Sequence, residues 1–308
     1  MTRLLRFAQE HAQETAEYGA EAAQHGPEEF DLGGTIMHHL VDASELELPW
    51  GAVHLPSGWY VNLGPLGTVD LAPTKHVVLM VAAAILVFAV FALLGRAVRR
   101  APADRAPQGF ANAIESMVLY FRDEVVRPNI GHGADSYTPY ILTVFFFILT
   151  MNLLGLVPWG GSATGNISVT AALAICTFVL VEVSGMRTLG FKGYMGTIFY
   201  APHGMHPAMR TMMLVIMTPV EILGKLTKPF ALAVRLFANM TAGHTLIFAL
   251  GGLGFVFMAS PAVWAGVTVG TTLMATAIML LEVFVAFLQA YIFAMLTSVF
   301  VGLIKHAH

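Results

Sequence analysis

Charged side chains are scarce in this sequence. Asp, Glu, Lys and Arg make up 11% of the 308 residues, whereas a soluble domain carries charge on about a quarter of its residues. Hydrophobic residues make up 56%, and the mean hydropathy is +0.70. Most of the surface therefore cannot face water, which excludes an ordinary soluble globular protein.

The residue patterns of several other protein classes are also missing. The single cysteine, Cys176, excludes an internal disulfide framework, and we expect it to fill space as a small apolar residue. There is no phosphate-binding loop, no dinucleotide-binding glycine pattern and no nucleophile arrangement. The sequence thus indicates no cofactor and no nucleic-acid partner. His203 and His206 stand close together, but no spacing completes a metal site.

Long apolar runs are what the chain has instead. A run of about 20 residues can cross a hydrocarbon core of about 30 Å as a helix. The runs that reach this length are 76–95, 136–159, 167–186, 211–254 and 262–304. They predict an all-α polytopic membrane protein with about five membrane-embedded helices.

The first 75 residues differ from the rest in charge. They hold eleven acidic and three basic residues, a net charge of −8, whereas the remainder carries +5. We read 1–75 as a polar, acidic N-terminal extension with some helical propensity over 4–23. An arginine cluster directly follows the run 76–95, so the positive-inside rule puts the extension outside the cytoplasm. Five crossings then leave the C-terminus in the cytoplasm, and the absence of a transit peptide favours a bacterial plasma membrane.

Residues 108–127 are amphipathic rather than uniformly apolar. Phe110, Ile114 and Met117 fall on one face at helical spacing, and charged residues occupy the other face. Such a helix lies in the interface between the bilayer and the cytoplasm. Pro128 is expected to end it.

The last third of the chain is too long for upright spans. As one helix, residues 262–304 would be about 65 Å long, which is twice the thickness of the hydrocarbon core. Such a helix must tilt, bend or project from the bilayer. With residues 211–254 it would form an oblique hairpin of two long helices.

An isolated arginine lies within the apolar segment 211–254. Arg235 has apolar neighbours on both sides and no acidic residue within a helical turn. A charge in mid-membrane costs from about 3 to over 10 kcal/mol, so it marks a candidate functional site. Arginine keeps its proton, so Arg235 would supply a fixed positive charge that attracts a carboxylate. The alternative is an arginine that reaches the interface with its long side chain.

An isolated carboxyl lies within the final segment. Glu282 is the only charge there before Lys305, and Gln289 follows seven residues later on nearly the same helical face. Val285, Ala286 and Phe293 complete this stripe. A lone intramembrane carboxyl suits proton transfer. The alternative is a structural glutamate bonded to a neighbouring helix.

Two further polar residues follow Arg235 on its helix. Asn239 shares the arginine face, whereas His244 points to the opposite side. This would separate a fixed positive charge from a titratable imidazole. A lone histidine in an apolar helix is, however, as often structural.

Other polar residues are weaker candidates. Glu221 either lines an exit path or pairs with Lys225 at i, i+4, and the pairing is the simpler reading. Glu182 presents the same ambiguity. Asn152, Asn166 and Ser168 either line an aqueous cavity or form hydrogen bonds between helices.

The segment KPFALAVRLFANMTAGHTLIF (228–248) resembles the signature of subunit a of F-type rotary ATP synthases, the stator proton channel. Further matches are MNLLGLVP (151–158), SATGNISVTAAL (162–173) and LEVFVAFLQAYIFAMLT (281–297). The resemblance covers nearly everything from residue 76 onward, and the extension 1–75 lies outside it.

This resemblance implies a non-catalytic subunit that couples proton flow to rotation of the c-ring and to ATP synthesis. Arg235 would be the essential stator arginine that faces a carboxylate of each c subunit and separates two half-channels. Asn239, His244, Glu282 and Gln289 would line the outer half-channel. The implied partners are the c-ring, the peripheral stalk subunit b, the other ATP synthase subunits and the lipid bilayer.

The sequence departs from the family's often-described pattern at two places. That pattern has Glu at the His244 position and His at the Glu282 position; the exchange seen here also occurs in the family. An exchange that keeps one imidazole and one carboxyl suggests that the pair functions as a unit. The family's Asp near the end of the second span is Gly155 here.

Two other protein classes fit the residues less well. A secondary transporter would use Arg235 to bind an anionic substrate, but such proteins usually contain internal repeats, and none is found. A purely structural membrane subunit would need neither the isolated arginine nor the isolated glutamate.

Overall fold

The computed structural model describes residue 34 and residues 45–48, 51–56, 58–62, 68–70, 72–100, 109–157, 161–199, 206–257 and 261–306. The helical propensity predicted over 4–23 lies outside these residues. Within the described part of the N-terminal extension, two short antiparallel hairpins precede the helices. They pair β1 (Glu45–Leu48) with β2 (Gly51–His54), and β3 (Tyr60–Asn62) with β4 (Thr68–Asp70).

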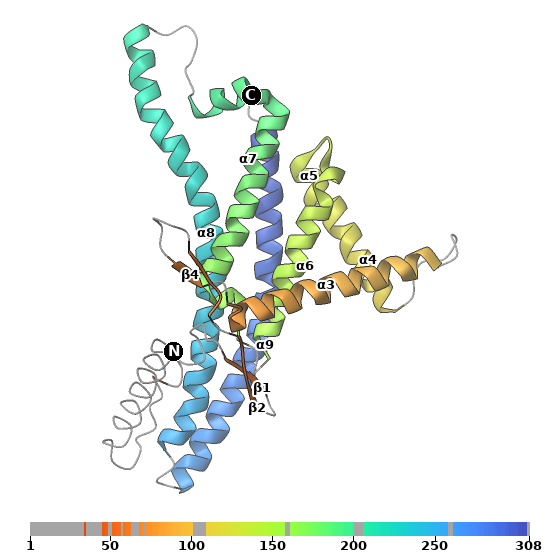
Figure 1. Ribbon diagram of the computed structural model, residues 1–308, viewed down its shortest axis with the longest axis vertical. Coiled ribbons are helices and arrows are strands. Elements are labelled where there is room, and N and C mark those ends of the chain that lie inside the picture. Colours follow the sequence, from red (N-terminus) through yellow and green to blue (C-terminus); the bar gives the residue numbers. More distant parts are fainter. Residues whose placement is uncertain are drawn as a thin grey trace, which may run out of the picture.

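Five helices in the described part of the chain are long and apolar enough to cross a bilayer, which confirms the predicted all-α membrane fold. They are α3 (Lys75–Arg100), α6 (Thr138–Gly155), α7 (Ile167–Ile198), α8 (Pro207–Val256) and α9 (Pro261–Lys305). Figure 1 shows α6 to α9 running lengthwise, with α3 lying across them.

The helices differ in how deeply they are buried: one is central and one is peripheral. In the most apolar window of each helix, 56% of the residues of α6 are buried but only 6% of those of α3. Phe145, Ile141 and Ile148 on α6 are fully buried. Helix α6 is therefore the core of the bundle, whereas α3 exposes its apolar side chains to its surroundings.

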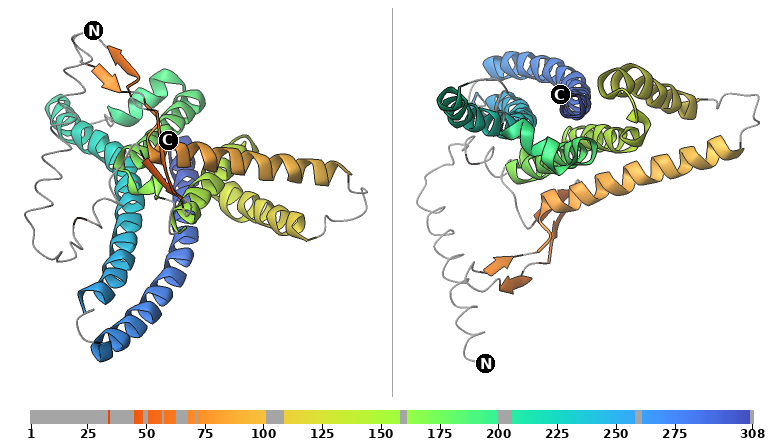
Figure 2. Two further views of the ribbon diagram at one scale, coloured as in Figure 1. Left: turned by 60° about the horizontal axis from the view of Figure 1, so that its bottom comes forward. Right: turned by 90° about the horizontal axis from the view of Figure 1, so that it is seen from above.

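Helices α8 and α9 are too long to stand upright in a bilayer. Their 50 and 45 residues correspond to about 75 Å and about 68 Å at 1.5 Å per residue. Both continue beyond α6 and α7 as a two-helix hairpin (Figures 1 and 2). Helices of this length must tilt, bend or project from the bilayer.

The amphipathic segment is longer than expected. Helix α4 (Phe110–Tyr120) passes into a π-helical turn at Phe121–Val126 and then into α5 (Arg127–Ile130). The sequence predicted an end at residue 127, but Pro128 lies in the first turn of α5, where its missing N–H is tolerated. The helical path ends instead before Gly131, which has a positive φ of 70°.

Helix α7 also extends past its predicted end at residue 186. It continues to Ile198 with a break at Gly190, where φ is 69° and ψ is 164°. Arg187 and Lys192, which follow the predicted apolar run, therefore lie on helix. Cys176 on the same helix is exposed, which corrects the expectation that it fills space inside the protein.

Candidate functional site

The candidate residues gather where the middle of α8 meets the middle of α9 and the end of α6. Arg235, Asn239 and His244 lie on α8, and Glu282 and Gln289 lie on α9. The apolar residues between them are buried, and this packing fixes the direction in which each candidate side chain points. Leu232, Ala233, Leu236 and Met240 on α8 are between 0% and 5% exposed, as are Ala286, Ala290 and Phe293 on α9.

Arg235 faces outward from this bundle. It is exposed, and among the residues that the structure describes no side chain pairs with its guanidinium. Its neighbours Leu236 and Leu232 are buried. A permanent cation in an apolar segment needs a counter-charge, water or a headgroup, so Arg235 leaves one interaction to be supplied from outside the chain. Asn239, one turn later, is half-buried.

His244 points into the bundle. Its Nε2 lies 2.8 Å from the carbonyl oxygen of Gly155, and its Nδ1 lies 2.9 Å from that of Met240. A neutral imidazole has one N–H and can donate to only one of these oxygens, whereas an imidazolium can donate to both. The imidazole thus connects α8 to the end of α6.

Glu282 is pressed against α8 beside this histidine. Gly243 directly precedes His244, and a Cβ atom added to Gly243 would collide with the carboxyl group of Glu282. The Oε2 atom of Glu282 is buried without a hydrogen-bond partner in the described structure. The glycine thus creates the space in which an imidazole and a carboxyl become neighbours.

Gln289 and Asn152 lie deeper between α9 and α6. Gln289 is 5% exposed, and its Nε2 has no partner within the described residues. Asn152 is fully buried, donates to the carbonyl oxygen of Ala286 (3.3 Å) and accepts from Thr164 Oγ1 (2.8 Å). Asn152 therefore fixes α6 against the stripe of α9 that carries Glu282 and Gln289.

Two of the weaker candidates lie outside this group. Asn166 caps α7 by accepting from the backbone N–H of Ser168 at 2.8 Å, and its amide contacts His76 at 3.3 Å. Ser168 is exposed. These contacts organise the start of α7 rather than the surroundings of Glu282.

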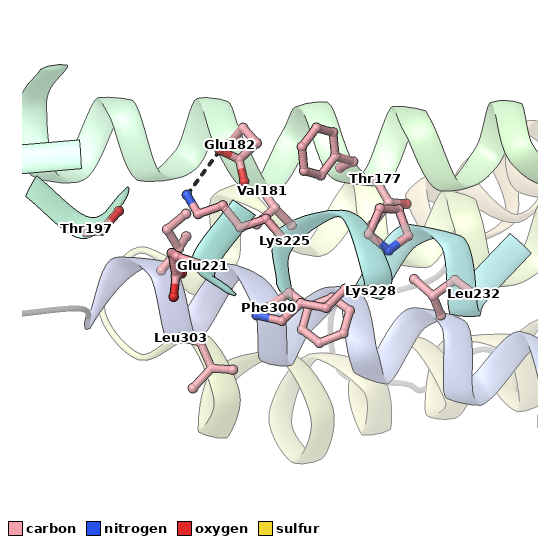
Figure 3. A pocket seen from close by; sticks show the side chains of 13 residues that line it. Thr177, Val181, Glu182, Thr197, Glu221, Lys225, Lys228, Leu232, Phe300 and Leu303 are labelled. Atoms are coloured by element: carbon pink, nitrogen blue, oxygen red, sulfur yellow. Dashed lines mark hydrogen bonds and ion pairs between the residues drawn. The ribbon is translucent and has the colours of Figure 1, made fainter. Parts of the chain in front are cut away.

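A second polar site lies nearer the N-terminal half of α8, in a cavity of about 130 Å³ between α7, α8 and α9 (Figure 3). Lys225 Nζ lies 3.4 Å from Glu182 Oε2 and 3.1 Å from the Tyr194 hydroxyl. Glu221 and Lys228 also line this cavity. The simpler reading, a Glu221–Lys225 pair, is wrong, because Lys225 pairs across to α7.

Three contributors to the site were not predicted from the sequence: Gly243, the Gly155 carbonyl and Thr164. A glycine inside a helix is unfavourable and often marks close packing, so Gly243 offered a signal beside His244. The Gly155 carbonyl offered none. No group of three or more His, Cys, Asp or Glu residues suited to a metal ion occurs within the described ranges.

Comparison with known proteins gives one consistent result. Residues 77–302 match the family described as ATP synthase A chain. The chain is 46% identical to ATP synthase subunit a 2 of Chlorobaculum tepidum over 285 residues, covering 92% of this chain and 76% of that protein. It is 43% identical to ATP synthase subunit a of Pelodictyon phaeoclathratiforme (94% and 80% covered) and of Anaeromyxobacter dehalogenans (93% and 74%).

Proposed function

Because the chain belongs to the ATP synthase A chain family, we propose that it passes protons to and from the carboxyl groups of a rotating c-ring. It is a membrane subunit of the ATP synthase complex and contributes to proton transport. In this proposal it catalyses no bond-making step itself. It couples proton flow to rotation, with the c-ring and the peripheral stalk subunit b as its partners.

The observation that carries the proposal is the outward, unpaired position of Arg235. A fixed guanidinium on an apolar helix face attracts an ionised carboxylate and is unsuited to carrying a proton itself. A c-subunit carboxyl that reaches Arg235 is favoured in its charged form, so it releases its proton on one side. It takes up a proton again once it has passed the arginine.

Two separate groups of polar residues support two half-channels. Asn239, His244, Glu282 and Gln289 would form the outer one. The cavity with Glu182 and Glu221 would form the inner one. Along α8, Glu221 precedes Arg235 by about 21 Å and His244 follows it by about 14 Å, at 1.5 Å per residue. Arg235 would thus separate the two paths and prevent a direct leak.

The direction of flow follows from the topology that we propose. The arginines at the end of α3 favour the cytoplasmic side for that end, which puts the N-terminal extension outside a bacterial inner membrane. The α8–α9 connection then lies on the outer side and Lys305 on the inner side. Each proton that crosses supplies about 2.3 kcal/mol per 100 mV.

The test is ATP-driven proton pumping by inverted membrane vesicles that contain the whole complex with Arg235→Ala. We expect pumping to be lost while the complex remains assembled, because the carboxylate loses its counter-charge. The matched control is Arg210→Ala, which removes an exposed arginine near the start of the same helix. Undiminished pumping by the assembled Arg235→Ala complex would overturn the proposal.

A further inference from the structure

Lys225 places a positive charge inside the cavity between α7, α8 and α9. Its ammonium nitrogen lies 3.4 Å from Glu182 Oε2 and 3.1 Å from the Tyr194 hydroxyl oxygen, both on α7. Figure 3 shows its side chain reaching from α8 toward Glu182. The Lys225 and Glu182 side chains are only 12% and 14% exposed, and Tyr194 is buried. The ion pair therefore belongs to the interior of the cavity rather than to the protein surface.

The ammonium group of Lys225 is held at one place. It donates to the carboxylate of Glu182 and to the hydroxyl of Tyr194. It also lies 4.2 Å from the centre of the Tyr194 ring, whose face attracts a cation. An ammonium group has three donors and no acceptor, so it binds oxygen atoms and aromatic faces as a free cation does. Lys225 thus acts as a cation that is covalently tied to the cavity.

The oxygen atoms of this cavity are suited to a metal cation. Hard metal cations bind carboxylate, other protein oxygens and water. The lining supplies carboxyl and hydroxyl oxygens from Thr177, Glu182, Thr197 and Glu221. The volume of about 130 Å³ leaves room for water molecules as further ligands. Without the Lys225 charge, these oxygens would offer Na⁺ a place to bind.

The balance of charge in the lining also depends on Lys225. The lining contains the two carboxyl groups of Glu182 and Glu221 and the two ammonium groups of Lys225 and Lys228, which together give a formal charge of zero. Lys228 lies 5.2 Å from the centre of the Phe300 ring. Loss of the Lys225 charge alone would leave a lining of charge −1, which attracts cations. The charge of Lys225 therefore sets whether the cavity attracts Na⁺.

A proton does not need the place that the ammonium group occupies. It passes between a carboxyl group and water by exchange along a hydrogen bond, whereas a metal cation must be surrounded by oxygen ligands. Glu221 lines the same cavity and is exposed. It can therefore exchange protons with water while Lys225 stays bound to Glu182.

We propose that Lys225 determines the ion specificity of the inner half-channel, because its ammonium group takes the place of a metal cation and excludes Na⁺ while protons pass. The proposal rests on the proposed function and adds a specificity-determining residue to it. Na⁺ stands here for the small monovalent metal cations that bind oxygen ligands.

The test measures whether Na⁺ inhibits proton pumping once the charge is removed. The whole complex carrying Lys225→Gln or Lys225→Met is purified and reconstituted into liposomes. The amide of Gln can still donate to Glu182, and the unbranched Met fills the space. ATP added outside drives the complexes whose inner side faces the medium, so added Na⁺ reaches the cavity directly. Pumping is compared in NaCl and in choline chloride at equal ionic strength, so that screening is the same.

Two controls separate the charge of Lys225 from other effects. Lys192→Gln removes an exposed lysine of α7 that does not line the cavity, and Lys225→Arg keeps the positive charge. We expect NaCl to lower pumping severalfold in Lys225→Gln and Lys225→Met. Pumping by the unmodified complex and by both controls should be the same in the two salts.

A second measurement does not depend on pumping. A ligand that binds only the folded state raises the denaturation midpoint, so NaCl should raise the midpoint of the two uncharged variants relative to choline chloride. This comparison decides the case if an assembled variant pumps in neither salt. An unchanged midpoint, an unchanged ratio of pumping in the two salts, a raised midpoint without inhibition, or an equal effect on Lys225→Arg would each overturn the role of Lys225.

These outcomes are distinguishable from failure of the proposed function. A complex in which Lys225 does not set the ion specificity would still lose pumping on Arg235→Ala. If the proposed function itself fails, Arg235→Ala would still pump.

Discussion

Gly302 allows the end of α9 to touch the backbone of α5. A Cβ atom added to Gly302 would collide with the carbonyl oxygen of Asn129 and lie 2.9 Å from its carbonyl carbon. The adjacent Val301 and Ile130 are fully buried. Neither backbone can rotate away as a side chain would, so Gly302→Ala must separate the two helices.

The size of the effect follows from two opposing contributions. Alanine is more favourable than glycine in a helix by about 1 kcal/mol. Overpacking a close contact costs about 1–3 kcal/mol, and the upper end applies because the atoms in the way are backbone. Separation would also weaken the hydrogen bond that Lys305 Nζ donates to the carbonyl oxygen of His132. The expected net loss in the free energy of unfolding is up to about 2 kcal/mol.

The assay is thermal denaturation of the purified complex in detergent, together with the amount of subunit in the membrane. Gly270→Ala on the same helix is the control, because a Cβ atom there meets nothing within 4 Å. We expect Gly302→Ala to lower the midpoint and Gly270→Ala to leave it unchanged or raise it. Equal midpoints for the two variants would refute the reasoning from the α5–α9 contact.

Two further predictions concern the carboxyl groups. Gly243→Ala should displace the carboxyl of Glu282 and lower ATP-driven pumping about tenfold, a factor that corresponds to about 1.4 kcal/mol. Gly224→Ala, where the space is open, should pump normally. Similar pumping by the two variants would contradict the packing argument. The Arg127 guanidinium bonds both carboxylate oxygens of Asp135 and lowers its pKa. The stabilisation is therefore complete above the ordinary Asp pKa of about 3.9 and is lost as the pH falls through the lowered value. Thermal denaturation from neutral to acid pH should show a smaller decline for Asp135→Asn, and an identical decline would count against this pair.

Periodicity predicted which faces of the helices are buried. The stripe of α9 that begins at Glu282 contains Ala286, Gln289 and Phe293, which are 0%, 5% and 2% exposed. A single sequence suffices here, because a helix in a bundle turns one face toward its neighbours. The number of long apolar helices followed equally from run length.

Contacts between distant segments could not be predicted in this way. The Glu221–Lys225 spacing suggested a pair, but such a pair stabilises a helix by only about 0.2–0.5 kcal/mol. Lys225 instead meets both Glu182 and Tyr194 on α7, and only the packing of α7 against α8 brings these groups together. The apolar run that ends at residue 186 likewise did not predict that α7 continues to Ile198.

Gly155 connects the two departures from the family pattern. A Cβ atom added to Gly155 would lie 2.9 Å from Ser162 Oγ and 3.2 Å from the methyl group of Met240, so this packing has no room for the family's aspartate. In place of a side chain, the position offers its backbone carbonyl, which contacts His244 Nε2.

A carbonyl oxygen can only accept a hydrogen bond, so the residue opposite must donate one. Histidine at position 244 can do so, whereas an ionised glutamate offers only acceptors and would face the Gly155 carbonyl unfavourably. The carboxyl of the pair is found instead at Glu282, where Gly243 leaves room for it. We therefore expect a glycine at position 155 to favour a hydrogen-bond donor at position 244.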